Sequence, residues 1–173
     1  MKSDTIAAIA TALSDAGIGI IRISGPKAIA VANRVVVNKK KEHTLKNWQT
    51  HTIHYGFVEE NGTILDEVMV SVMKAPRSYT TEDTVEINCH GGVLLTKRVL
   101  EAVLHAGARM AEPGEFTKRA FLSGRIDLSE AEAVMDLIQA KNQFSMQASI
   151  KQLRGSVAEK VKSLRAALLY EIA

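Results

Sequence analysis

The amino-acid sequence predicts an α/β protein of the α+β kind, with a mixed β-sheet domain followed by the long helices of a truncated helical domain. Two observations support this class. Residues 1 to about 115 carry short β-like runs broken by Gly, Pro and Asn, whereas residues 126 to 173 contain no Pro and one Gly. Because the composition changes near Gly124, we predict one domain at residues 1–122 and a second at residues 123–173.

The composition is that of an ordinary globular chain. It has 173 residues, of which 46% are apolar, and 22 Lys plus Arg stand against 19 Asp plus Glu. Such values exclude a disordered or collagen-like chain. The net charge of +3 is spread along the sequence, which does not match the concentrated basic footprint of a dedicated nucleic-acid binder.

A single cysteine, Cys89, excludes an internal disulfide framework and a thiolate-rich zinc site. The five histidines form no metal-binding pattern with nearby acids, so we predict no metal site. No apolar stretch reaches the roughly 18 residues that a spanning helix needs. We therefore expect a cytoplasmic protein with no membrane contact.

The first half of the sequence predicts strands and one helix in a clear order. AGIGIIRISGP, residues 16–26, predicts a buried strand closed by a Ser-Gly-Pro turn, and Pro26 suits the first turn of a helix that runs to about Val37. The β-branched run Thr50–Val58 predicts a strand. Asn61-Gly62 then signals a hairpin whose partner strand is Ile64–Met73.

Three further elements follow before the composition changes. Thr84–His90 alternates apolar and polar residues and predicts a strand. Val93–His105 predicts a helix capped by Gly107, and a short strand is expected around Arg109–Ala111.

The remaining residues predict helices. Asp127 and Glu130 have the spacing of a capping box at a helix start. A second apolar stripe, spaced by three and four residues, predicts one long amphipathic face: Met146, Ile150, Leu153, Val157, Val161, Leu164 and Leu168. No helix-stop signal precedes Ala173, so we expect the helical domain to be truncated there.

The strand Thr84–His90 is the most informative local pattern. Alternation places Val85, Ile87 and Cys89 on one face and Glu86, Asn88 and His90 on the other. A carboxylate on the polar face can accept two adjacent N–H groups of a ligand. The alternative is an ordinary solvent-facing sheet surface.

Two arginines also stand out. Arg22 interrupts the apolar run Ile18–Ile23, where a buried guanidinium needs an anionic or carbonyl partner; the alternative is an arginine that snorkels at a strand end. Arg125 follows Ser123-Gly124 in the turn between the two regions, from which a side chain can reach either domain. The alternative for Arg125 is a solvated turn charge.

No catalytic residue is predicted. Cys89 and His90 point to opposite strand faces, which disfavours a Cys-His nucleophilic pair, and Cys89 is expected in the core. Gly91-Gly92 precedes a helix and could approach an anion. Without a GxxxxGK[ST] pattern, a tight strand-to-helix turn is the favoured interpretation.

Four segments, taken together in this order, resemble one family. They are DTIAAIAT (Asp4–Thr11), AGIGIIRISGP (Ala16–Pro26), SYTTEDTVEINCHGG (Ser78–Gly92) and PGEFTKRAFLSGRIDLSEAEAVMDLI (Pro113–Ile138). With these motifs the chain resembles the N-terminal part of the bacterial tRNA-modification GTPases of the MnmE family, also called TrmE. The resemblance covers nearly the whole chain and is weakest at residues 38–65 and in the final helix.

For the first domain, the resemblance implies a tetrahydrofolate-binding and dimerising fold similar to the folate domain of one-carbon transferases. The first helices of a central helical domain would follow. The family's folate ligands map onto Arg22, Glu86 and Arg125. The bound cofactor would be a tetrahydrofolate derivative, such as 5-formyl- or methylene-tetrahydrofolate, and a homodimer is expected.

For the whole protein, the resemblance implies a carboxymethylaminomethyl-type modification at carbon 5 of the wobble uridine of tRNA, formed together with the flavoprotein MnmG. GTP, Mg and K would belong to a GTPase domain whose phosphate-binding loop this sequence does not contain. We therefore do not expect this chain alone to hydrolyse GTP or to be catalytic. The alternative hypothesis is a dimerisation or docking module without a ligand of its own.

Overall fold

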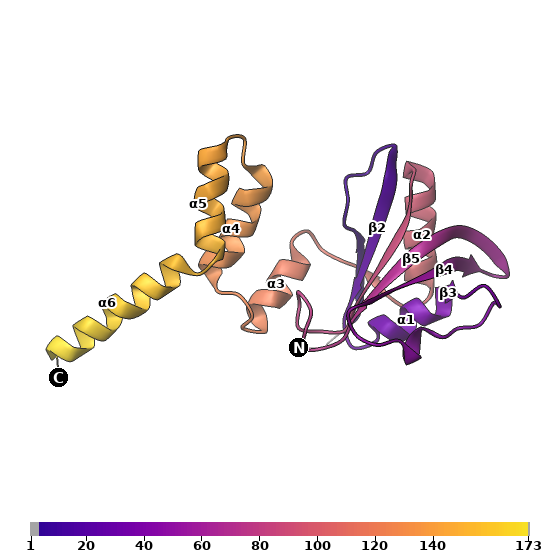
Figure 1. Ribbon diagram of the computed structural model, residues 1–173. Coiled ribbons are helices and arrows are strands. Elements are labelled where there is room, and N and C mark those ends of the chain that lie inside the picture. The colour runs from indigo at the N-terminus through magenta and orange to yellow at the C-terminus, as the bar shows by residue number, and fades with distance from the viewer. Residues whose placement is uncertain (1–3, 173) are drawn as a thin grey trace. The chain divides into compact units, whose positions relative to one another are not determined.

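The computed structural model describes residues 4–172, and the chain divides into two compact units, Met1–Phe116 and Thr117–Ala173 (Figure 1). These compact units differ from functional domains. The boundary between the two functional domains, which we predict at residues 122 and 123, therefore stays a prediction. Each unit is described by itself below.

The first unit is built on one seven-stranded sheet, which confirms the predicted α/β class. The strand order is β3-β4-β5-β6-β2-β1-β7, and all neighbours are antiparallel except β1 and β7. The strands are β1 (Ile6–Ile9), β2 (Ala16–Ser24), β3 (Val36–Val37), β4 (Thr52–Glu60), β5 (Thr63–Met73), β6 (Thr84–Gly91) and β7 (Arg109–Met110). The strand β1 lies within the DTIAAIAT motif and was not predicted as a strand.

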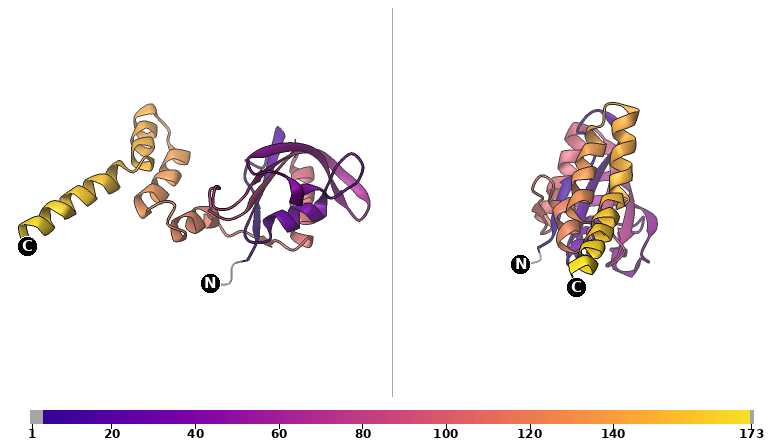
Figure 2. Two further views of the ribbon diagram at one scale, coloured as in Figure 1. Left: turned by 60° about the horizontal axis from the view of Figure 1, so that its bottom comes forward. Right: turned by 90° about the vertical axis from the view of Figure 1, so that its left-hand side faces the viewer.

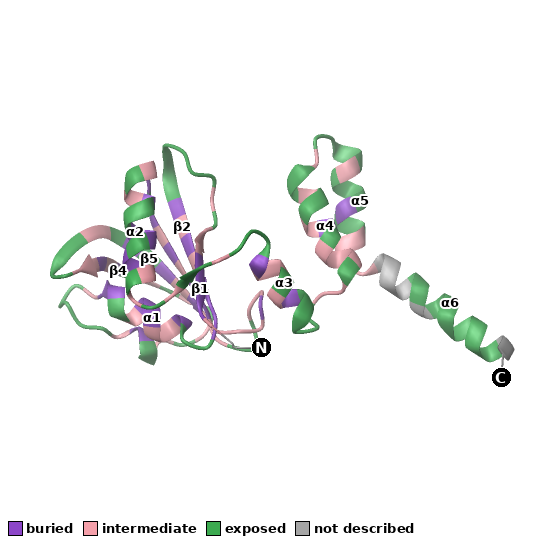
Figure 3. Cartoon of the chain, turned by 180° about the vertical axis from the view of Figure 1, so that it is seen from behind, coloured by how far each residue is buried: buried purple, intermediate pink, exposed green. Residues whose placement is uncertain are grey.

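Two helices, α1 (Ala28–Val35) and α2 (Val93–His105), cover one face of this sheet, and a 3-10 turn η1 (Leu45–Asn47) lies beside α1 (Figure 2). Ile21, Val70 and Ile87 are completely buried beneath the helices. Figure 3 shows this buried layer along the strands. Burial of each such side chain stabilises the fold by about 1.5–3 kcal/mol.

The hairpin between β4 and β5 has the predicted two-residue turn. Glu60 pairs with Thr63, and the intervening Asn61 and Gly62 have φ values of 51° and 81°. Positive φ at both positions is the geometry of a type I′ turn, which Asn-Gly sequences favour. The turn fixes the register that sends alternate side chains of β5 into the core.

The helix predicted from Pro26 to about Val37 is shorter at both ends. α1 begins at Ala28, two residues after Pro26, and ends at Val35. Val36 and Val37 instead form β3, which pairs with β4. β-branched valines pack well on a pleated surface and lose side-chain freedom in a helix, so the available sheet edge overrides the helical pattern.

The second unit contains helices only, among the residues that the structure describes. α3 (Glu115–Leu122) begins in the first unit and is followed by α4 (Leu128–Gln139), α5 (Gln143–Leu153) and α6 (Ser156–Ile172). The predicted capping box is confirmed. The Asp127 carboxylate accepts the backbone N–H of Glu130, and the Glu130 carboxylate accepts the backbone N–H of Asp127, each at 2.8 Å.

The single long amphipathic helix predicted from Met146 to Leu168 is wrong, because α5 ends before Gly155 and α6 starts after it. Gly155 adopts φ +78°, a left-handed conformation that terminates helices. In both views of Figure 2, α6 runs on from α5 rather than folding back along it. Within the stripe, the side chain of Val157 lies outside the described residues, and Leu168 is exposed.

We predict that Gly91→Ala lowers the free energy of unfolding by about 1–3 kcal/mol, because an added methyl group would overpack the β2–β6 pair. A Cβ at Gly91 would lie 2.5 Å from the carbonyl oxygen of Ala16, whereas a Cβ at Gly17 meets nothing within 4 Å. Gly17→Ala is therefore the matched control, with a change within about 0.5 kcal/mol. Urea denaturation followed by the fluorescence of Trp48 measures both; equal losses would contradict the steric argument.

Candidate functional site

Arg22 and Glu86 form an ion pair on the sheet face opposite the two helices. The two residues are direct cross-strand neighbours of β2 and β6. Nε of Arg22 donates to Oε1 of Glu86 at 2.7 Å, and the side chains are 34% and 22% exposed. The expectation that Arg22 needs an anionic or carbonyl partner is confirmed: the partner is the carboxylate of Glu86, another of the predicted site residues.

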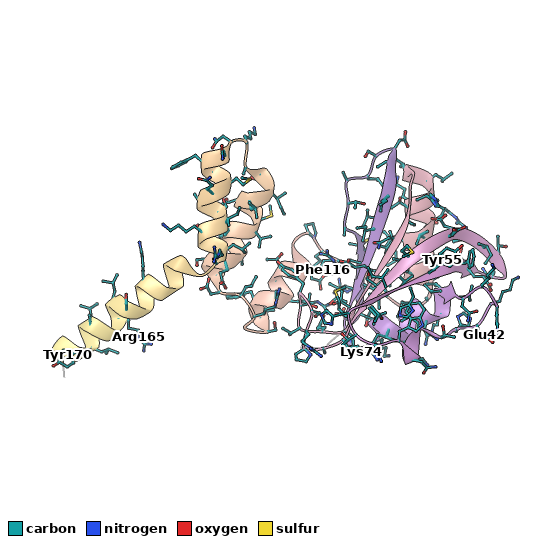
Figure 4. All side chains as sticks on the ribbon, viewed as in Figure 1. Glu42, Tyr55, Lys74, Phe116, Arg165 and Tyr170 are labelled. Carbon is teal, nitrogen blue, oxygen red and sulfur yellow. The ribbon has the colours of Figure 1, made fainter. Side chains whose placement is uncertain are left out.

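The aromatic ring of Phe116 lies beside the guanidinium group of Arg22. The guanidinium carbon of Arg22 lies 5.7 Å from the centroid of the Phe116 ring, within the range of a cation–π interaction. Phe116 stands in the first turn of α3 and is labelled in Figure 4. Phe116 was not predicted as a site residue, because nothing local to residues 113–117 indicates contact with a strand about 90 positions earlier.

A charged cluster holds the start of α3 against the first unit. Arg109 donates from Nε to Asp4 at 2.7 Å and from a terminal nitrogen to Glu115 at 2.8 Å. The carboxylates of Glu115 and Asp4 raise the pKa of Arg109 above its usual range. Because Glu115 immediately precedes Phe116, the cluster positions that ring as well as the helix start.

The chemistry of the pair suits a ligand with both N–H donors and carbonyl or carboxylate acceptors. The bond between Arg22 and Glu86 uses one guanidinium nitrogen and one carboxylate oxygen. The terminal nitrogens of Arg22 and the second oxygen of Glu86 lie outside that bond. A guanidinium binds planar acceptors and a carboxylate accepts adjacent N–H groups, so the two residues fit the polar edge of a pterin ring.

Arg125 belongs to the second unit. It is exposed and follows Gly124, whose φ is +74°, in the turn between α3 and α4. Its backbone N–H donates to the carbonyl of Ala120 at 3.0 Å. The structure places Arg22 and Glu86 side by side within the first unit, and the role of Arg125 stays a prediction.

His90, the last polar residue of the same strand face, forms an ion pair with Asp66 of β5. Nδ1 of His90 lies 2.8 Å from Oδ1 of Asp66, and the backbone N–H of His90 donates to Oδ2 at 2.8 Å. The hydrogen bond to Asp66 raises the pKa of His90. Sequence reasoning missed Asp66, because the partner of a strand residue depends on a register that no local pattern at Asp66 reveals.

Cys89 packs into the core, as predicted. It is 3% exposed, and its Sγ donates to the carbonyl of Gly19 at 3.3 Å. Burial raises the pKa of the thiol, which makes it a poor nucleophile. Gly91 and Gly92 form the predicted tight turn: the chain passes from β6 at Gly91 to the α2 cap at Gly92.

Among the side chains that the structure describes, no group of three or more from His, Cys, Asp or Glu could hold a metal ion. Within the same part of the chain, no helix combines the length and apolar character needed to cross a lipid bilayer.

Comparison with known proteins shows the family to which this chain belongs. Residues 5–125 match the family described as "GTP-binding protein TrmE N-terminus". The chain therefore belongs to the TrmE N-terminal family, as its motifs indicated.

Three similar proteins from different bacteria share one name. The chain is 58% identical over all of its 173 residues to the "tRNA modification GTPase MnmE" of Lachnoclostridium phytofermentans. Proteins of the same name in Listeria welshimeri and Streptococcus mutans are each 53% identical, over 100% and 98% of this chain. The chain spans 38%, 37% and 36% of the length of these three relatives.

We predict that Asp66→Asn lowers the pKa of His90 toward its ordinary value of 6.5. The raised pKa means that protonated His90 stabilises the fold: this contribution is complete below pH 6.5 and is lost as the pH rises through the raised value. A pH titration of the His90 imidazole signals by NMR measures the shift.

The matched control is Glu67→Gln, because Glu67 is the smallest of the causes that raise the pKa of His90. This substitution should lower that pKa less than Asp66→Asn does. Equal pKa values in the two variants would show that the hydrogen bond to Asp66 is not the main cause.

Proposed function

We propose that the chain binds a tetrahydrofolate derivative through Arg22, Glu86 and Arg125, as the N-terminal part of a tRNA-modification GTPase. The observation that carries this proposal is the half-buried pair of Arg22 and Glu86, on the sheet face away from the helices and beside the ring of Phe116. Opposite charges held at this depth offer a ligand both hydrogen-bond donors and acceptors in one place.

Each residue has a role that follows from its chemistry. Glu86 accepts the adjacent N–H groups of the pterin ring, while Arg22 and Arg125 bind carbonyl or carboxylate groups of the cofactor. The bound derivative, 5-formyl- or methylene-tetrahydrofolate, supplies a one-carbon unit. The chain itself binds and orients this cofactor, and we assign it no catalytic residue.

For the whole protein, the name of the relatives supports a role in tRNA modification and GTP hydrolysis. We propose that it acts as a cytoplasmic homodimer and, with the flavoprotein MnmG, forms the carboxymethylaminomethyl-type group at carbon 5 of the tRNA wobble uridine. GTP, Mg and K are assigned to a GTPase domain outside these 173 residues.

The alternative is a dimerisation or docking module without its own ligand. One observation favours it: α6 presents an apolar stripe in which Val161, Leu164 and Leu168 are 57%, 64% and 63% exposed. Large apolar side chains gathered on one surface often mark a protein–protein contact.

Calorimetric titration with 5-formyl-tetrahydrofolate tests the cofactor proposal. We expect saturable binding that Glu86→Gln weakens about tenfold or more, because the amide loses the charge that strengthens the N–H bonds. Glu101→Gln is the matched control, since Glu101 is an exposed acid of α2 paired with Arg98 and lies outside the site. A folded chain that ignores the cofactor would favour the docking module, and equal affinity in Glu86→Gln would refute the assigned contact.

Sedimentation of the chain separates the two proposals further. If the first unit forms the homodimer, Leu164→Glu on α6 leaves the dimer intact. If the apolar stripe forms it, this buried charge dissociates the dimer, since an unpaired charge in an apolar contact is costly. Ser163→Glu, one position away in the same helix, controls for the added charge.

A further inference from the structure

The side chain of Arg22 is held by two groups of different chemistry. Its Nε donates to Oε1 of Glu86 at 2.7 Å, and its guanidinium carbon lies 5.7 Å from the centroid of the Phe116 ring. A single hydrogen bond through Nε leaves the plane of a guanidinium free to tilt about that bond. An aromatic ring beside the cation adds an attraction that depends on the position of the guanidinium relative to the ring. The two contacts together therefore define where the terminal nitrogens of Arg22 point.

Phe116 follows a carboxylate whose hydrogen bonds hold the start of α3 in one place. Both terminal nitrogens of Arg109 donate to Glu115, Nη2 to Oε1 at 2.8 Å and Nη1 to Oε2 at 3.1 Å. The backbone N–H of Glu112 donates to the same Oε2 at 2.8 Å. Glu115 is only 8% exposed, and a bidentate pair of guanidinium and carboxylate fixes the relative orientation of its two groups. The backbone that carries the Phe116 ring is therefore held firmly at this point.

Arg109 connects this carboxylate to the sheet that carries Arg22. It lies on β7, and its backbone N–H donates to the carbonyl of Thr5 at 2.9 Å. The strand β7 pairs with β1, and β1 pairs with β2, the strand of Arg22. The contacts therefore form a closed circuit. It leaves the sheet at Arg109, passes through Glu115 to Phe116, and returns to the sheet at Arg22.

The orientation of Arg22 before a ligand arrives affects how tightly that ligand binds. A long side chain that is ordered only on binding loses part of the interaction energy to that ordering, and holding it in the bound orientation beforehand removes the loss. The side chain of Arg22 is 34% exposed, so without the ring its terminal nitrogens can turn toward solvent. Phe116 is itself half-buried, which places the ring at the level of the ion pair.

We propose that Phe116 is a positioning residue of the cofactor site. Its ring orients the guanidinium of Arg22 toward a carbonyl or carboxylate group of the folate. The bond between Arg109 and Glu115 holds the ring in place. The inference rests on the proposed function, because it takes Arg22 to be a ligand of the folate, and it assigns to Phe116 an action through Arg22 rather than on the cofactor.

Hydrogen exchange of the Arg22 Nε–H with solvent, measured by NMR, tests the contact without a ligand. Phe116→Leu should speed this exchange about threefold or more, because the bond to Glu86 opens more often once the ring is lost. Phe116→Tyr keeps an aromatic face and should leave the rate within about twofold. The matched control is Phe121→Leu, which removes a ring that is 41% exposed on the same helix and should not change the rate. The Arg22 signal is assigned by its loss in Arg22→Lys.

Calorimetric titration with 5-formyl-tetrahydrofolate tests the consequence for the cofactor. Phe116→Leu should weaken binding about three- to fivefold, whereas Phe116→Tyr and Phe121→Leu should stay within about twofold of the unaltered chain. Glu115→Gln should also weaken binding. The double variant of Glu115→Gln and Phe116→Leu should bind as Phe116→Leu does, because the two residues act through one contact. Urea denaturation followed by the fluorescence of Trp48 verifies that each variant is folded.

Three results would overturn the inference: an unchanged exchange rate in Phe116→Leu, equal losses of affinity in Phe116→Tyr and Phe116→Leu, or additive losses in the double variant. Failure of the cofactor proposal has a different signature, which is absent folate binding by the unaltered chain. That result would remove the cofactor from both proposals. The exchange rates are measured without folate, so they still test the contact between the ring and the guanidinium.

Discussion

The pairing of β2 with β6 is the constraint on which both the core and the candidate site depend. Its register sets Arg22 opposite Glu86 and Ile21 opposite Ile87. Because side chains alternate between sheet faces, the register that buries the isoleucines also brings the two charges together on the other face. A slip of one residue would send Arg22 into the core, where an unpaired guanidinium is strongly unfavourable. The register that forms the hydrophobic core is therefore also the register that forms the proposed ligand site.

The sheet face away from the helices is divided into two chemically different regions. Around Arg22 the face is charged, and the cluster of Arg109 and Glu115 places Phe116 beside it. Further along β6 the same face carries Ile18, Tyr55 and Met69 together with the polar residues Glu67, Asn88 and His90. The charged region around Arg22 and Glu86 suits the polar edge of a cofactor.

Patterns with a short period were predicted well because their physics is local. Alternation in Thr84–His90 identified the buried and polar faces, and Asn61-Gly62 identified the hairpin turn. The failures occurred where local preferences compete. Val36 and Val37 continue a helical pattern but join a sheet edge, and Gly155 interrupts a stripe whose apolar spacing continues on both sides. In the first case a tertiary partner decides, and in the second a single residue without Cβ adopts the left-handed conformation that ends the helix.

The sequence by itself determined the fold class, the family, the two faces of the strand Thr84–His90 and the need of Arg22 for a partner. Only the tertiary structure decided which groups meet. Glu86 is 64 positions from Arg22, and Asp66 is 24 positions from His90. Such contacts depend on strand order and register, which arise from packing the whole sheet against α1 and α2. A local pattern contains the preference of each side chain, but the identity of its partner is a property of the assembled sheet.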